Sequence, residues 1–193
     1  MSDWCYPVLN GAPDKGHVYT VQPGLGFLAP EYYAIRGMSH SGCDYNATTG
    51  GNTDLKDPVY AASDGVVVQA KNYGGWGNIV LIYHETAGVW TQYAHLFDYN
   101  VRIGQAVTMG QRIGRIGQGG RSKKGVPLFT AHLHFEVRYR YVPAYDWPSS
   151  NVRNDSKDQE DALTRLSRVD PIAFLEKNDA LKTYRAVQAA RVA

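Results

Sequence analysis

Apolar and polar residues alternate along much of the middle of the chain, with the two-residue period of a β-strand. The stretch from Thr130 to Arg140 shows this most clearly, because Leu133, Phe135 and Val137 fall on one face. The opposite face carries only polar residues: His132, His134, Glu136 and Arg138. A solvent-facing strand usually has threonine, lysine or glutamate in such places, so two neighbouring histidines need another explanation.

The rest of the middle of the chain has the same strand-and-turn character. Asp64-Gly65 has an apolar run on each side and predicts a hairpin. Residues 78–84 follow a glycine turn and predict a buried strand, and residues 89–99 predict another. Closely spaced glycines divide residues 101–120 into short strands. No apolar stripe has the helical period here, so the fold class is mainly β.

The flanks of this region differ from it. Residues 1–36 are rich in proline, glycine and tyrosine, and predict loop with short extended pieces. Residues 143–193 begin as a polar loop and then predict three helices: 159–169, 170–178 and 180–192. Asp170 is suited to the N-cap of the second helix and Pro171 to its first turn. We expect a core at 37–142, with both flanks packed on the same domain, because a separate domain of that size would be marginally stable.

Composition narrows the classes of protein. The chain has 193 residues, of which 44% are hydrophobic, which suits one globular domain. The net charge of +2 gives no strong attraction to nucleic acid, and no apolar run is long enough to span a membrane. The N-terminus lacks the basic and apolar regions of a signal peptide. The chain therefore stays in the cytoplasm, leaves by another route, or has already lost a signal. Cys5 and Cys43 either form one disulfide or are two buried thiols.

The two histidines of the first strand are suited to binding a metal ion. Side chains two residues apart on a strand project from the same face, roughly 6.5–7 Å apart, so His132 and His134 can converge on one ion, with zinc the obvious candidate. A half-exposed polar face is the alternative. His40 and Asp44 would lie too far apart on a straight strand, but Gly42 between them allows a bend. Two histidines and one aspartate would leave a fourth zinc position open for water, as in catalytic sites.

Three motifs, in this order, resemble those of the M23, or lysostaphin/LytM-type, zinc metallopeptidases: His40-Ser-Gly-Cys-Asp44, Tyr93-Ala-His95-Leu96 and His132-Leu-His134-Phe-Glu136. Residues 57–68, 74–84, 101–120 and 170–175 are similar to supporting segments of the same family. Altogether the resemblance covers about residues 24 to 142 and 170 to 175. It departs from the family at 45–57 and at 119–132, which are longer than usual here, and this bears on substrate preference.

The resemblance implies an antiparallel β-sheet or sandwich core of the lysostaphin type, with residues 37–142 as the catalytic core, peripheral loops and C-terminal helices. It implies that one zinc ion is bound by His40, Asp44 and His134. It also implies that His132 and His95 are the catalytic histidines. The implied partner is the peptide cross-links of bacterial peptidoglycan, cleaved by a monomeric endopeptidase. The missing signal peptide then favours a phage endolysin, which stays in the cytoplasm until release and acts in the periplasm or cell wall.

Physical chemistry is compatible with these roles. His132 can take a proton from water and pass it to the leaving amine, while His95 either holds His132 or hydrogen-bonds the developing oxyanion. No HExxH motif is present, so a glutamate base is not indicated. Glu136 is either a partner of a metal ligand or a plain strand-face carboxylate. His84 is expected to be a surface turn residue.

Other interpretations are open at this point. Tyr32 or Tyr33 can be considered as an oxyanion donor, although the chain has 14 tyrosines. A virion-associated wall-degrading protein would use the same chemistry. A non-catalytic M23-like binding scaffold is disfavoured because the three ligand positions are all filled. A cupin-like metal protein is disfavoured because no further histidine follows the His-x-His pair.

Overall fold

The computed structural model describes residues 3–8, 17–142 and 156–180. Within these ranges the helices are α1 (Pro30–Arg36), the short 3-10 helix η1 (Gly74–Trp76), α2 (Lys157–Arg165) and α3 (Pro171–Lys177). The strands are β1 (Tyr19–Val21), β2 (Cys43–Ala47), β3 (Pro58–Tyr60), β4 (Gly65–Asn72), β5 (Asn78–His84), β6 (Val89–Tyr99), β7 (Ala106–Val107), β8 (Arg112–Ile116), β9 (Leu133–Arg138) and β10 (Arg168–Val169).

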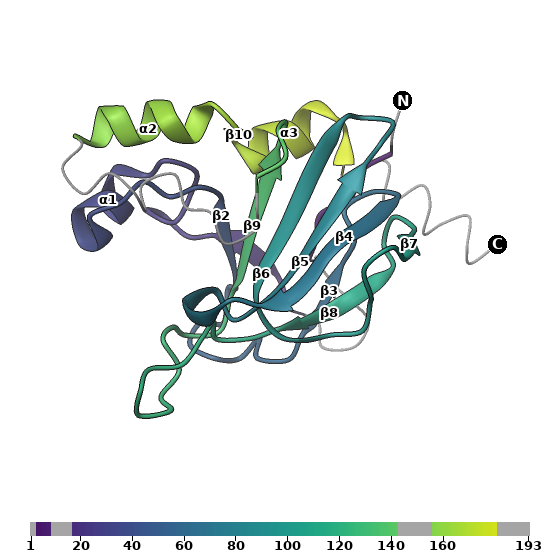
Figure 1. Ribbon diagram of the computed structural model, residues 1–193. Coiled ribbons are helices and arrows are strands. Elements are labelled where there is room, and N and C mark those ends of the chain that lie inside the picture. The colour runs from purple at the N-terminus through teal and green to yellow at the C-terminus, as the bar shows by residue number, and fades with distance from the viewer. Residues whose placement is uncertain (1–2, 9–16, 143–155, 181–193) are drawn as a thin grey trace.

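Neighbouring strands in this sheet run antiparallel, in the order β1-β2-β9-β6-β5-β4-β7 (Figure 1). Beside this path, β10 pairs with β9, and β8 pairs with both β3 and β6. The expected mainly β, antiparallel core is therefore confirmed. Among the described residues no helix is long and apolar enough to cross a membrane.

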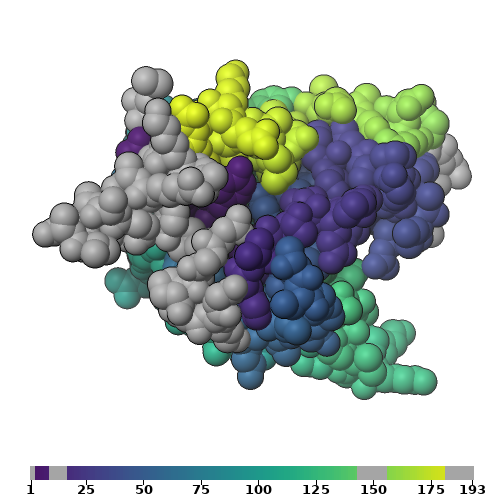
Figure 2. Space-filling model, turned by 180° about the vertical axis from the view of Figure 1, so that it is seen from behind, coloured from purple at the N-terminus to yellow at the C-terminus, as the bar shows by residue number. Residues whose placement is uncertain are grey.

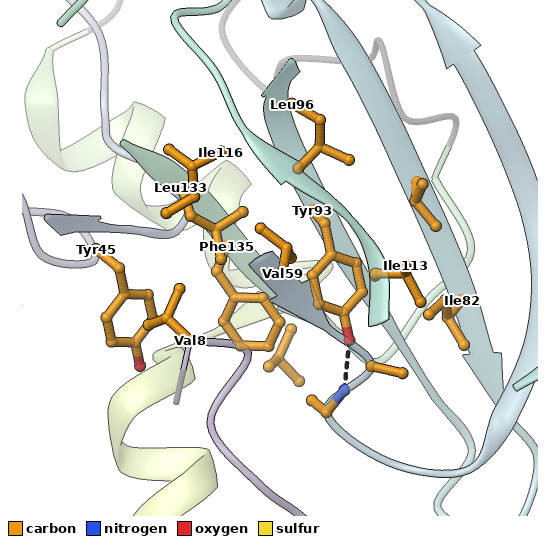
Figure 3. Packing of buried hydrophobic residues seen from close by; sticks show 14 of the residues in the cluster. Val8, Tyr45, Val59, Ile82, Tyr93, Leu96, Ile113, Ile116, Leu133 and Phe135 are labelled. Carbon is orange, nitrogen blue, oxygen red and sulfur yellow. Dashed lines mark hydrogen bonds between the residues drawn. The ribbon is translucent and has the colours of Figure 1, made fainter. Parts of the chain in front are cut away.

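Strand β9 lies between β2 and β6 and carries the alternating apolar and polar residues of the Thr130–Arg140 stretch. Its apolar residues Leu133, Phe135 and Val137 are fully buried and belong to the main hydrophobic core. Figure 3 shows Phe135 and Leu133 among the core side chains of neighbouring strands, where the Tyr93 hydroxyl accepts a hydrogen bond from the Ala62 amide at 2.8 Å. A slip of one residue would exchange the two faces of β9, so this packing fixes its register.

The terminal segments pack on this core. Trp4 is buried and meets Phe174 of α3 edge-on, with ring centroids 4.8 Å apart. Seen from behind, α3 and the N-terminal residues lie side by side (Figure 2). The predicted helix at 170–178 is confirmed by α3, and Asp170 caps it by accepting from the amides of Ile172 and Ala173.

Two other expectations about the flanks need adjustment. The helix expected at 159–169 begins earlier and ends at Arg165, because a Ser156–Gln159 capping box starts it and residues 168–169 pair with β9 instead. The segment 1–36, expected to be loop with extended pieces, also contains α1, whose proline at the first turn favours a helix start. The helix predicted at 180–192 lies outside the described residues, apart from Ala180.

The hairpin predicted at Asp64-Gly65 is wrong. β3 pairs with β8, and β4 pairs with β5 and β7, so the two strands that flank this turn do not pair with each other. The Asp64 carboxylate accepts instead from the Met109 amide at 2.7 Å, which ties the turn to a distant part of the chain. Local turn chemistry predicts where a chain turns, but long-range packing decides which strands pair.

The prediction that His84 is a surface residue is also wrong. Its side chain is buried, donates from Nδ1 to the Asp64 carbonyl at 2.8 Å and hydrogen-bonds the Thr91 hydroxyl through Nε2 at 2.7 Å. Trp4 covers it, with ring centroids 4.9 Å apart. Of the two alternatives for the cysteines, the structure has two buried free thiols.

Candidate active site

Two adjacent strands bring the predicted metal ligands together. Asp44 of β2 lies directly opposite His134 of β9 in the strand register. His40 precedes β2, and Gly42 lets that segment approach β9 closely, because a Cβ there would overlap the Phe135 carbonyl oxygen. Sequence separations of 90 and 94 residues are thus reduced to direct contact of side chains.

The three side chains converge through one atom each. His134 Nδ1 lies 2.9 Å from Asp44 Oδ1 and 3.1 Å from His40 Nε2, and His40 Nε2 lies 3.2 Å from the same Asp44 oxygen. Ligand atoms about 2.0–2.1 Å from a tetrahedral zinc are about 3.3–3.4 Å from one another. The imidazole and carboxylate donors are also types that zinc prefers, so the site fits a zinc ion. The role of these residues as ligands stays a prediction.

Hydrogen bonds on the far sides of the rings set which nitrogens are free. A carbonyl or an ionised carboxylate only accepts, so His40 carries a proton on Nδ1, toward the Gly26 carbonyl at 2.9 Å. His134 likewise donates from Nε2 to Glu136 Oε1 at 3.1 Å. The lone pairs of His40 Nε2 and His134 Nδ1 therefore face each other beside a carboxylate. Such an arrangement needs a cation or a proton between them.

His132 lies at the edge of this centre, just before β9. Its Nδ1 donates to the Thr130 carbonyl at 2.9 Å, and its Nε2 lies 3.6 Å from Asp44 Oδ2. His132 as a whole residue is 7% exposed, whereas His40 and His134 are at most 1% exposed. The two histidines of the original motif are thus inequivalent, with His134 in the buried donor set and His132 open to the cleft.

His95 reaches the same site because of a bulge in β6. In a regular strand it would share the core-facing side with Tyr93, but β6 has one more residue than β5 between the pairs Tyr93–Val80 and Leu96–Asn78. His95 lies in this bulge and has a φ of 62°, a left-handed backbone conformation that is uncommon outside glycine. Its ring then lies 4.8 Å from that of His132, and its Nδ1 donates to the Trp76 carbonyl at 3.0 Å.

The pKa values reflect a buried and highly charged cluster. Burial alone would raise the pKa of Asp44, but His132 and His40 hold it well below its ordinary value. Burial, reinforced by His132 and His134, lowers the pKa of His95 well below the usual range. Burial acts to lower the pKa of His134 too, yet hydrogen bonds to Asp44 and Glu136 raise it to about 9. Asp44 is therefore an anion and His95 is neutral near pH 7.

A cleft opens over these residues. A volume of about 430 Å³ is lined by Asp44, His95 and His132, together with Tyr32 and Phe129. A more apolar space of about 290 Å³ adjoins it over the Trp76 ring. This size is typical of ligand pockets. Of the two tyrosines considered from the sequence, only Tyr32 lines the cleft, and it stacks on His40 with ring centroids 4.1 Å apart.

Two groups of residues in the site were not identified from the sequence. Trp76 packs against His134 and His95, with ring centroids 5.0 and 5.6 Å away, and the glycines around it were the only local signal. Arg138 and Arg168 surround Glu136 in a fully buried ionic cluster. Glu136 thus contacts a predicted metal ligand, which is one of the two alternatives open for it from the sequence.

The chain matches the profile of peptidase family M23 over residues 38–146, more than half of its length. This chain belongs to peptidase family M23. The M23 match contains the three converging residues as well as His95 and His132. It ends before α2, β10 and α3, so the C-terminal extension lies outside it.

Known proteins that resemble this M23 chain include a peptidoglycan endopeptidase and lysostaphin. The chain is 38% identical over 104 residues to the peptidoglycan DD-endopeptidase ShyA of Vibrio cholerae, covering 54% of this chain and 21% of that protein. A zinc-containing peptidase from Vibrio cholerae has a similar structure, with a TM-score of 0.52, 30% identity, and 71% and 36% of the two chains covered. The structure of the catalytic domain of lysostaphin from Staphylococcus simulans is also similar, with a TM-score of 0.50 and 28% sequence identity. The match covers 83% of this chain and 92% of the lysostaphin domain. The match with this M23 chain covers about a fifth of the length of ShyA and of the DD-carboxypeptidase/endopeptidase Mpg of Neisseria meningitidis.

Proposed function

We propose that this chain is a zinc-dependent endopeptidase that hydrolyses peptide cross-links of bacterial peptidoglycan. The observation that carries the proposal is the convergence of His40 Nε2, Asp44 Oδ1 and His134 Nδ1 within 3.2 Å of one another. The other ring nitrogen of each of the two histidines is already hydrogen-bonded. A free imidazole nitrogen, His132 Nε2, lies beside this set and faces the cleft. Buried donors with an adjacent titratable group are typical of hydrolytic metal sites.

When bound by His40, Asp44 and His134, zinc polarises a carbonyl group and lowers the pKa of water towards neutrality. His132 Nε2 accepts the proton of the attacking water and later delivers it to the leaving amine nitrogen. The Thr130 carbonyl, which holds Nδ1, fixes the tautomer that leaves Nε2 free for this exchange. Asp44, 3.6 Å away, stabilises the imidazolium that forms in between.

His95 supports this step by packing against the His132 ring, with ring centroids 4.8 Å apart, and not as a hydrogen-bond donor. Its Nδ1 proton is engaged by the Trp76 carbonyl, and its lowered pKa keeps Nε2 without a proton. A neutral His95 in this tautomer cannot donate to an oxyanion. Of the two roles open from the sequence, we therefore favour that of orienting His132.

Tyr32 is the proposed oxyanion donor. Burial and the nearby Asp44 raise the pKa of Tyr32 to about 12, so its hydroxyl keeps its proton near neutral pH. Stacking on His40 holds the ring at the cleft, where a hydroxyl can donate to charge that develops on the scissile carbonyl.

Peptidoglycan is proposed as the substrate because the named relative ShyA is a peptidoglycan endopeptidase. Action as a phage endolysin, or as another wall-lytic enzyme that reaches the periplasm or cell wall from the cytoplasm, belongs to the same proposal. A non-catalytic scaffold is disfavoured, since such a protein has no need for a complete set of metal donors beside a free histidine.

Purified sacculi test the proposal. Wild-type protein loaded with zinc and the His134→Ala variant are incubated with sacculi, and the released muropeptides are identified by mass spectrometry. We expect the wild type to cut a peptide cross-link and the variant to leave the sacculi intact. Intact cross-links after incubation with the zinc-loaded wild type would contradict the proposal, and the cut bond would identify the specificity.

A further inference from the structure

The C-terminal extension reaches the metal centre from two directions. Its described part, residues 156–180, lies outside the family match and contains α2, β10 and α3. In Figure 1, α2 lies above α1, and β10 continues the sheet beside β9. Figure 2 shows α2 against the N-terminal segment that leads to His40.

The first direction runs from Arg168 through Glu136 to His134. Arg168 Nε donates to Glu136 Oε2 at 2.8 Å, and the other oxygen, Oε1, accepts from His134 Nε2 at 3.1 Å. Ser41 also donates to Oε1, at 2.6 Å, and Arg138 to Oε2, at 2.7 Å. All four partners have buried side chains. The carboxylate that fixes the tautomer of His134 is thus itself oriented by an arginine of the C-terminal extension.

The second direction runs from α2 to His40. Glu160 Oε2 accepts from the Ser39 amide at 2.7 Å, and the Ser39 hydroxyl donates to Asp161. Lys157 Nζ donates to the Leu28 carbonyl at 3.2 Å, and the Leu28 amide donates in turn to the His40 carbonyl at 2.9 Å. The residue before His40, and the one that pairs with its backbone, are therefore both attached to α2.

We propose that the C-terminal extension positions the metal ligands, with Arg168 acting on His134 through Glu136, and α2 acting on His40 through Ser39. The inference rests on the proposed metal centre. Arg168 and Glu160 are positioning residues, since neither contacts the converging donor atoms. Groups that hydrogen-bond a metal ligand directly commonly change metal affinity by about 10- to 100-fold, because they fix its tautomer and orientation, and Arg168 acts on His134 through such a group, Glu136.

The chemistry of Glu136 explains why a second arginine matters. Each of its oxygens has two donors, so removal of Arg168 leaves Oε2 with Arg138 alone, whose other guanidinium nitrogens already bond Gln92 and the Val142 carbonyl. The carboxylate is then free to turn toward Arg138 and away from His134. A change in the protonated nitrogen of His134 follows, which a purely structural role for Arg168 would not produce.

Zinc affinity separates positioning from stability. The dissociation constant for zinc is measured by competition with a chromophoric chelator for wild type, Arg168→Met, Arg168→Lys, Glu160→Ala and Leu175→Ala, with folding checked by circular dichroism. Leu175 is a buried core residue of α3 and serves as the control that lowers stability alone. We expect a 10- to 100-fold weaker affinity in Arg168→Met, partial recovery in Arg168→Lys, about a 10-fold loss in Glu160→Ala, and a change under twofold in Leu175→Ala.

A second readout uses no metal. Long-range ¹H–¹⁵N spectra of the metal-free protein are recorded above the His134 pKa of about 9, where the ring holds one proton, and report which ring nitrogen carries it. The pattern should change in Arg168→Met but not in Leu175→Ala. Wild-type affinity and an unchanged His134 pattern in folded Arg168→Met would overturn the inference. If that variant does not fold, Arg168→Lys and Glu160→Ala decide by the same comparison. Absence of zinc binding by the wild type, or unchanged binding by His134→Ala, would instead overturn the metal centre itself and the inference with it.

Discussion

Replacing Gly42 with alanine should open the metal centre without removing any of its ligands. A Cβ at this position would lie 3.0 Å from His134 Nε2 and 2.9 Å from Glu136 Cγ, and closer still to the Phe135 carbonyl oxygen. Ordinary contacts begin at 3.4 Å, so β2 has to move away from β9 by at least the shortfall of 0.5 Å. The displacement exceeds the tolerance of about 0.2 Å in metal–ligand distances.

The expected result is a loss of about 100-fold in zinc affinity, or about 2.8 kcal/mol. Overpacking should also lower the free energy of unfolding by about 1–3 kcal/mol. Zinc affinity is measured by chelator competition and stability by urea denaturation. Gly50→Ala is the control: its φ of 75° makes alanine strained there, but no atom lies within 4 Å of the added Cβ. It should cost about 1 kcal/mol of stability and leave zinc affinity unchanged. Gly42→Ala protein that binds zinc within threefold of wild type would refute the reasoning.

Three further predictions concern single side chains. His132→Gln should lower kcat by about 10²- to 10⁴-fold with unchanged zinc content, because the proton acceptor is lost but the ligands stay; a variant with wild-type kcat would exclude His132 as the base. Tyr32→Phe should lower kcat about 100-fold with little change in KM, whereas Tyr33→Phe should match wild type; equal effects of the two would argue against an oxyanion donor. Burial lowers the pKa of His84 from 6.5 to about 4 in the folded protein, so the unfolded chain binds the proton first as the pH falls. Wild type should therefore lose about 3 kcal/mol more of its free energy of unfolding between pH 6.5 and pH 4 than His84→Gln, as measured by urea denaturation; parallel curves would show that His84 titrates normally.

The sequence predicted the strand at the centre of the site well, because its two faces differ in polarity at every position. Leu133, Phe135 and Val137 have to face the core, and this alone puts His132 and His134 on the opposite side. The prediction that His134 binds a metal ion together with His40 and Asp44 rested on the three motifs, in their order along the chain, that resemble those of the M23 family. No local pattern indicates that residues 90 or more positions apart pair across β2 and β9.

The errors share a physical cause, which is that packing between distant segments overrides local signals. Asp64-Gly65 has the composition of a hairpin turn, yet its flanking strands find better partners elsewhere. His84 follows an apolar strand like a surface residue, yet Trp4 from the N-terminal segment covers it. Simple alternation along β6 would put His95 on the face of Tyr93, whereas the bulge at φ 62° turns it into the cleft.

A zinc titration of cleavage tests the central claim most directly. Protein stripped of metal with a chelator is supplied with increasing zinc, and new amino groups released from purified sacculi are counted. The account predicts no release by the stripped protein and a rise that reaches its plateau at one zinc per chain, absent from His134→Ala. New amino groups released by the stripped protein, or none at any zinc concentration, would contradict it.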